Sequence, residues 1–244
     1  MSADGPVWGA STDVGTRRAS NEDSYVAAEP VFAVADGMGG HEAGEVASAA
    51  ATRALARLAG KPEVTARDVQ ERLEAARARL QALPPTLGRS PGTTVAGVVL
   101  TEHEGAPHWL VLNLGDSRTY RLQGHVIEQL SVDHSEVQEL VDQGHISPEE
   151  ALRHSRRHVL TRSLGATSSL AVDYLLVPVE QGDRMLVCSD GLTGELDDTV
   201  IAGLLRSYPH PQDAADALVA AAVAAGGRDN VTAVVVDAPR DLSA

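Results

Sequence analysis

Apolar runs of strand length recur along the chain and are separated by turn residues, a pattern typical of a protein rich in β-strands. Runs that alternate or stay apolar occur at 7–12, 24–29, 31–36, 93–100, 108–114, 118–122, 125–130, 170–179, 184–189 and 231–237. Gln123-Gly124 stands between two of these runs and predicts a tight hairpin turn. Pro and Gly are frequent in 83–92, which we expect to be a loop.

Helical spacing of apolar residues appears between groups of these strands. The helices predicted in this way lie at 42–58, 69–83, 197–206 and 211–225. The segment 131–157 is polar and helical in character, and Ser147 followed by Pro148 and two glutamates is a helix start signal. Helices grouped between runs of strands predict an α+β fold, in which helices cover stacked antiparallel sheets.

The composition is that of a globular protein with an acidic surface. Its 244 residues are 43% apolar and no repeat or linker divides them, so we expect one domain over residues 1–244. The net charge is −14, and no basic patch offers a footprint for a phosphate backbone. This balance argues against a nucleic acid as partner.

Signals for export or membrane insertion are not evident. The N-terminal segment is acidic, and the longest alanine-rich run, at 217–225, is too short to span a bilayer. The single cysteine, Cys188, lies in an apolar run, so we expect a buried small hydrophobe and not a reactive thiol. We therefore expect a cytoplasmic protein without a membrane partner.

Four aspartates occupy equivalent places at strand ends. Asp36, Asp116 and Asp190 each follow an apolar run, and Asp229 precedes the last one. If the last strand is antiparallel to the others, all four carboxylates meet at one end of the sheet. Each alone reads as an ordinary turn or cap residue. Together they favour a site for hard cations such as Mg²⁺ or Mn²⁺, because converging carboxylates repel one another without a cation between them.

The glycines that follow Asp36 admit two interpretations. They make a flexible loop, or they let the backbone approach a ligand so closely that the Gly37 carbonyl joins a metal shell.

A second polar stretch, GTRRASNED at 15–23, places two arginines before Asn21-Glu22-Asp23. A guanidinium beside a carboxylate-metal site can bind a phosphate group bidentately, and a surface ion pair is the alternative.

With these features in place, the sequence resembles the metal-dependent serine/threonine protein phosphatases of type 2C in their compact bacterial form. The resemblance runs from about Gly9 to Val236. It rests on an ordered set of motifs: GTRRASNED, VADGMGGHEAGE, PGTT, LGDSR, LSVDHS, CSDGL and GRDNVT. It implies a four-layer α-β-β-α sandwich of two antiparallel sheets flanked by helices, with a metal centre in a cleft at one end.

The resemblance also implies a role for each matching residue. Asp36 would bridge two metal ions, the Gly37 carbonyl would bind the second, and Glu22 would support it. Asp190 and Asp229 would complete the shell of the first. A third and weaker metal would lie between Asp116 and Asp190, and Arg18, not its neighbour Arg17, would grip the substrate phosphate.

The expected reaction is hydrolysis of phosphoserine and phosphothreonine by a water activated between two Mn²⁺ or Mg²⁺ ions. His41 is the nearest imidazole in sequence to the metal loop and is the candidate general acid, although the eukaryotic relatives carry their histidine directly after Asp-Gly, where this chain has Met38. A metal-bound water is the alternative acid.

The segment from about 133 to 165 resembles the flap beside the active site in this family. His158 could touch the third metal or the substrate there, and a solvated loop histidine is the alternative. The arginines of this segment would favour acidic phosphopeptides or offset local acidic charge. They are Arg153, Arg156, Arg157 and Arg162.

The leading hypothesis is a monomeric bacterial protein phosphatase that acts on phosphorylated proteins and opposes a serine/threonine kinase. Three alternatives remain at this stage: a pseudo-phosphatase that senses phosphoproteins, a phosphatase devoted to one anti-sigma antagonist, and a general phosphomonoesterase or phosphodiesterase. Intact Asp36, Asp190, Asp229 and Arg18 argue against the first. The Arg-x-x-Asn-Glu-Asp element argues against the second, and only substrate profiling separates the third.

Overall fold

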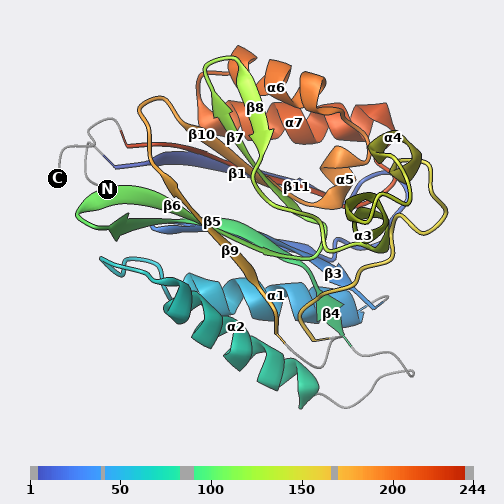
Figure 1. Cartoon of the computed structure of the whole chain (residues 1–244), viewed down its shortest axis with the longest axis horizontal. Coiled ribbons are helices and arrows are strands. Elements are labelled where there is room, and N and C mark those ends of the chain that lie inside the picture. The colour runs from blue at the N-terminus through green and yellow to red at the C-terminus, as the bar shows by residue number, and fades with distance from the viewer. Residues whose placement is uncertain (1–4, 40–41, 83–90, 166–169, 240–244) are drawn as a thin grey trace.

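The computed structural model describes residues 5–39, 42–82, 91–165 and 170–239. Two antiparallel sheets are stacked on one another, and a pair of long helices covers the outer face of each (Figure 1). The α-β-β-α sandwich predicted from the sequence is confirmed.

The first sheet has the strand order β1-β11-β10-β7-β8. Its strands are β1 Val7–Asp13, β7 Arg118–Gln123, β8 Val126–Gln129, β10 Arg184–Cys188 and β11 Val231–Asp237. The second sheet has the order β2-β3-β5-β6-β9, with the short β4 paired to β3. Its strands are β2 Asp23–Ala28, β3 Val31–Met38, β4 Gly92–Thr93, β5 Val95–His103, β6 Ala106–Leu114 and β9 Asp173–Pro178.

Two long helices lie on each outer face. The helices α1 Glu42–Ala56 and α2 Ala66–Gln81 pack on the second sheet, and α6 Asp198–Ser207 and α7 Pro211–Ala225 pack on the first (Figure 1). Three short helices lie beside one end of the sandwich: α3 Glu136–Asp142, α4 Pro148–Ala151 and α5 Asp190–Thr193.

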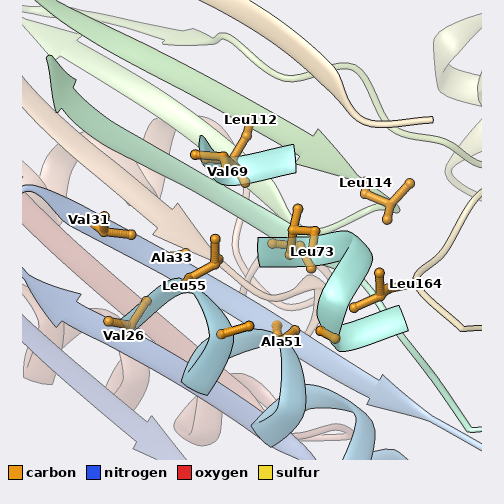
Figure 2. Close-up of a cluster of buried hydrophobic side chains, with 14 of the residues drawn as sticks. Val26, Val31, Ala33, Ala51, Leu55, Val69, Leu73, Leu112, Leu114 and Leu164 are labelled. Atoms are coloured by element: carbon orange, nitrogen blue, oxygen red, sulfur yellow. The ribbon is translucent and has the colours of Figure 1, made fainter. Parts of the chain in front are cut away.

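The central strands, such as β3, are apolar on both faces because each sheet is covered on both sides. In β3, Val31 and Ala33 face the helices and pack in one cluster with Leu55 of α1 (Figure 2). Phe32 and Val34 point the other way and join the cluster between the two sheets. Successive side chains of a strand alternate between faces, so burial of both faces gives an unbroken apolar run in the sequence.

Local signals place several helix starts. Ser147 accepts a hydrogen bond from the Glu150 amide, and the Glu150 carboxylate accepts one from Ser147 N at 2.8 Å, as the capping box in the sequence predicts. Thr65 and Asp68 form a second capping box at the start of α2, so that helix begins three residues before the predicted position.

Other predictions were less accurate. The β7–β8 turn lies at Gly124-His125, one residue later than predicted, because Gly124 has a positive φ of 57° there. The segment 131–157 holds only the two short helices α3 and α4, and α3 is followed by Gly144 at φ 70°. Most of the predicted loop 83–92, and the end of the predicted helix 69–83, lie outside the described residues.

Among the described residues, no helix combines the length and apolar character needed to cross a bilayer.

The edge strand β1 is fastened to α7 by an unusually close approach. The side-chain amide of Gln212 accepts from Ala10 N at 3.1 Å and donates to Ala10 O at 2.9 Å. A Cβ atom on Gly9 would lie 2.2 Å from the Gln212 Cα, so only glycine allows this contact.

We predict that Gly9→Ala lowers the free energy of unfolding by about 2 kcal/mol or more, because the atoms that it meets are backbone and cannot rotate away. Gly203→Ala is the matched control. Gly203 lies inside α6 with open space where a Cβ would go, so alanine there is expected to stabilise by about 0.5–1 kcal/mol. Urea unfolding of both variants checks the pair. Equal effects of the two substitutions would contradict the close contact.

Candidate metal centre

The structure brings the four predicted aspartates to one end of the sandwich. Asp36 lies in β3, Asp190 opens α5 directly after β10, and Asp229 precedes β11. Asp116 follows β6 in the connection to β7. The other three all act on Asp36 electrostatically, which shows their proximity, and they come from both sheets and not from a single sheet edge.

Asp36 ends the row of β3 side chains that points between the sheets. Its backbone is fixed reciprocally by Thr94, whose hydroxyl accepts from Asp36 N at 2.9 Å and whose amide donates to Asp36 O at 2.9 Å. The Thr93 hydroxyl donates to the same carbonyl at 2.8 Å. The PGTT motif therefore holds the strand end that carries the carboxylate.

A fifth aspartate, Asp23, lies opposite Asp36 in the β2–β3 register and joins the two sheets. Its Oδ2 atom accepts hydrogen bonds of 2.7 Å from the hydroxyls of Ser189 and Thr232. Ser189 directly follows β10 and Thr232 lies in β11, so both belong to the first sheet. The Oδ1 atom of Asp23 is buried and has no hydrogen-bond partner among the described residues. Asp23 was not among the site residues predicted from the sequence.

Burial and mutual repulsion raise the pKa values of the carboxyl groups of Asp23, Asp36, Asp116 and Asp190. Burial is the largest cause at each of them, followed for Asp36 by the charge of Asp23, for Asp116 by that of Asp190, and for Asp190 by that of Asp229. The pKa of Asp23 is raised to about 7, again chiefly by burial.

These observations fit a site for hard divalent cations. The donor set consists of carboxylate oxygens and includes no cysteine, and one of these oxygens, Asp23 Oδ1, is buried without a partner in the described part of the chain. Bound cations would also remove the repulsion that raises the pKa values of the carboxyl groups. Among the described residues, no three acidic, histidine or cysteine side chains already form a ready-made cage.

The glycines after Asp36 permit close approach of the chain to itself. Gly37 N donates to the Glu22 carbonyl at 3.2 Å, and a Cβ on Gly37 would lie 2.3 Å from the Gly44 carbonyl oxygen. A Cβ on Gly44 would lie 2.3 Å from Oε2 of Glu22. Glycine at both positions thus lets the Glu22 carboxylate reach the space between β3 and α1.

Arg18 lies at the exposed side of the same site. Its guanidinium donates to Asp229 Oδ2 at 2.6 Å, and this hydrogen bond is the main cause of its raised pKa, with Asp36 and Glu22 adding to it. Its side chain is 53% exposed, so part of its hydrogen-bonding capacity faces solvent.

The flap histidine His158 lies near the site but is mostly in solvent. Its Nδ1 atom is 4.0 Å from Asp190 Oδ2, and its side chain is 67% exposed. Two of the flap arginines offset local acidic charge, since Arg156 pairs with Glu136 and Arg162 with Asp173. His41 lies outside the described residues.

Two further residues, Asn230 and His134, position the site and were not predicted from the sequence. The Asn230 side chain accepts from Glu22 N at 2.8 Å and donates to the carbonyls of Val14 and Ser20, so it fastens the arginine-bearing loop to β11. The buried His134 accepts from Gly115 N at 3.2 Å through Nδ1, which orients the residue before Asp116. Only their place in the motifs GRDNVT and LSVDHS hinted at them.

Comparison with known proteins agrees with this geometry. The sequence signature of the family described as protein phosphatase 2C matches residues 16–221.

The chain belongs to the protein phosphatase 2C family.

Relatives of this phosphatase match it over nearly its whole length. The serine/threonine phosphatase stp of Listeria monocytogenes is 38% identical over 247 residues, which cover 95% of each chain. The structure of the Mycobacterium tuberculosis serine/threonine phosphatase PstP/Ppp is 34% identical, with a TM-score of 0.89, and the match covers 96% of this chain and 99% of that one.

A further structure, the catalytic domain of PstP in complex with two manganese ions, is also 34% identical, with a TM-score of 0.82 and coverage of 96% of this chain and 98% of that chain. The sequence-based predictions of the family and of a metal-dependent protein phosphatase are therefore confirmed. The roles of the individual residues stay predictions.

The raised carboxyl pKa values predict how the stability of the metal-free phosphatase depends on pH. The folded state holds protons that the unfolded chain loses near pH 4, so this contribution to stability is present below pH 4 and is lost as the pH rises towards about 7, the pKa of Asp23. We expect the melting temperature without metal to fall between pH 5 and 8. We expect Mn²⁺ to raise it more at pH 8 than at pH 5, because metal and protons compete.

Asp23→Asn tests the assignment to this site, with the exposed Asp213→Asn as control. The fall of the melting temperature with rising pH should become shallower in Asp23→Asn and stay unchanged in Asp213→Asn. An unchanged slope in Asp23→Asn, measured by differential scanning calorimetry in EDTA, would show that Asp23 does not hold the proton.

Proposed function

We propose that this phosphatase hydrolyses phosphoserine and phosphothreonine in proteins, using a water activated in a binuclear Mn²⁺ or Mg²⁺ centre. The observation that carries the proposal is the convergence of buried carboxyl groups from both sheets, with Arg18 at the exposed side. Its presence in a chain of the protein phosphatase 2C family supports the same reaction.

The residues proposed to hold the two main ions are Asp36, the Gly37 carbonyl, Asp190, Asp229 and Glu22. Asp116, with Asp190, would hold a third and weaker one. When bound, the ions supply a water of lowered pKa and positive charge near the phosphoryl oxygens.

The chain's own residues orient the substrate and the carboxylates. Arg18 is positioned to donate to the phosphate oxygens, because its guanidinium is already aligned by Asp229 and remains half-exposed. Thr94 holds the backbone of Asp36 through the hydrogen bonds described above, and Asp23, opposite Asp36 in the β2–β3 register, ties β2 to the first sheet. The site end of the sandwich is therefore prearranged before substrate arrives.

The leaving serine or threonine oxygen needs a proton, and His41 is the proposed donor. His158 is the described imidazole nearest to Asp190, and its 4.0 Å separation and exposure leave it free to meet substrate from the flap side. A covalent phosphocysteine finds no support, since Cys188 is buried and its pKa is raised to about 12 by burial.

The proposed partners are phosphorylated proteins and a serine/threonine kinase whose action this phosphatase reverses. We propose a monomer working in the cytoplasm.

The decisive experiment follows release of phosphate from a phosphothreonine peptide with Mn²⁺, with EDTA, and with Asp36→Asn. We expect hydrolysis that requires metal and falls by about a thousandfold or more in the variant, because one carboxylate of the shared site is lost. A folded protein that binds Mn²⁺ by calorimetry and releases no phosphate from a broad peptide panel would favour a phosphoprotein sensor instead. Equal turnover of small phosphate esters and diesters would favour a general phosphoesterase.

The role of Arg18 predicts a separate effect. Arg18→Ala should lower kcat/KM for a phosphopeptide by about 10- to 100-fold, since a charge-assisted hydrogen bond to phosphate is lost. The melting temperature should change little, because an exposed ion pair contributes at most about 1 kcal/mol. The neighbouring Arg17→Ala is the control and should retain activity. If the Arg17 variant loses more activity than the Arg18 variant, the assignment between the two is reversed.

A further inference from the structure

A small cavity is lined by residues of α1, α2 and the turn that follows α1. The two helices form the layer that covers the second sheet (Figure 1). The volume of the cavity is about 100 Å³. We call this surface the arginine groove. It is lined by Ala54, Arg57, Arg72, Ala75, Ala76 and Arg79.

The arginines of the groove have one carboxylate within helical reach, Asp68, and it is engaged elsewhere. Arg72 and Arg79 lie two turns apart on α2. The positions three or four residues from both, where an ion-pair partner would lie, are occupied by Ala75 and Ala76. Asp68, one turn before Arg72, is already taken by Lys61 and by the Thr65 cap. Among the described residues, none of the ion pairs involves an arginine of the groove.

The other helix adds to the same charge. Arg53 and Arg57 are four residues apart in sequence, a like-charge spacing that is unfavourable in an isolated helix. Both are exposed, as are Arg72 and Arg79.

Acidic residues of α2 are directed to other faces of the helix. Glu71 pairs with Arg67, and Glu74 accepts from Gln70 at 3.0 Å. These two glutamates therefore already have partners on α2, and Arg57, Arg72 and Arg79 of the groove form no ion pair within the described part of the chain. In a chain of net charge −14, such a concentration of positive charge is attractive to an anion.

The shape of the groove fits a single anionic group. A volume of about 100 Å³ leaves room for a small group such as one carboxylate. Guanidinium groups bind carboxylates bidentately, and the alanine floor admits the methylene groups of a glutamate side chain.

The surroundings favour a protein segment over a membrane. The large hydrophobic side chains exposed on the described surface include none from residues 53–82, so the groove has no apolar anchor for a bilayer. No tryptophan, tyrosine or phenylalanine lines it for base stacking. An acidic polypeptide needs neither an apolar anchor nor an aromatic side chain to bind.

We propose that the arginine groove docks an acidic segment of protein substrates, away from the metal centre. This inference rests on the proposed phosphatase function. Gly44, beside Glu22, and Arg57 are thirteen residues apart along α1 and its end, or about 20 Å at 1.5 Å per residue. A substrate must therefore carry its acidic segment at least about six extended residues from the phosphorylated residue, at about 3.3 Å each.

The test compares a phosphothreonine peptide with versions extended by a ten-residue Gly-Ser spacer and a hexaglutamate segment, at either end. One extended version should have a KM about three- to tenfold below that of the parent, at low salt. In the double variant Arg72→Ala/Arg79→Ala, that advantage should disappear, while kcat and the kinetics of the parent peptide stay unchanged. The double variant Arg67→Ala/Arg206→Ala removes the same charge elsewhere and should keep the advantage.

Binding of a fluorescent, unphosphorylated hexaglutamate peptide, followed by anisotropy, separates this inference from the proposed function. Binding weakened only in the groove variant supports docking even if no phosphopeptide is hydrolysed. Hydrolysis with no gain from either extension, or equal loss of binding in both double variants, would overturn it. So would binding to vesicles of anionic phospholipid with no binding to the acidic peptide.

Discussion

Repulsion among buried carboxyl groups is the interaction around which one end of this phosphatase is arranged. Asp23, Asp36, Asp116 and Asp190 lie in one region where burial and mutual charge raise their pKa values. Such an arrangement persists only if the surrounding structure determines it fully. Here the strand ends, the reciprocal Asp36–Thr94 hydrogen bonds and the hydroxyls that bind Asp23 provide that support.

The two-sided burial of the sheets supplies the necessary rigidity. β3 is packed against α1 on one face and against the first sheet on the other, so Asp36 extends from an element that cannot tilt without disturbing two cores. Asp23 hydrogen-bonds across the gap between sheets directly beside it. The relative placement of the sheets and the spacing of the carboxylates are therefore coupled, so a change in one alters the other.

The sequence predicted the layers because unbroken apolar strands and amphipathic helices follow directly from them. It also predicted the four strand-end aspartates, since their positions repeat along the chain. It did not predict Asp23, whose importance depends on its register opposite Asp36 and on hydroxyls more than 160 residues away. The arginine groove was equally hidden, because its members are spread over two helices and no basic run marks them. The turn at Gly124 was shifted by one residue because a positive φ, which the sequence does not show, decides its place.

The contact between Gln212 and β1 has a consequence for how the protein behaves at high concentration. An edge strand exposes unpaired amides and carbonyls to which a second polypeptide can add, and this is a common route to aggregation. At Ala10 these groups are occupied by a glutamine side chain that acts as a neighbouring strand would. The protection of this sheet edge at Ala10 thus depends on a helix far along the chain, and a substitution of Gln212 would leave that amide and carbonyl open to another polypeptide without a change in the strand itself.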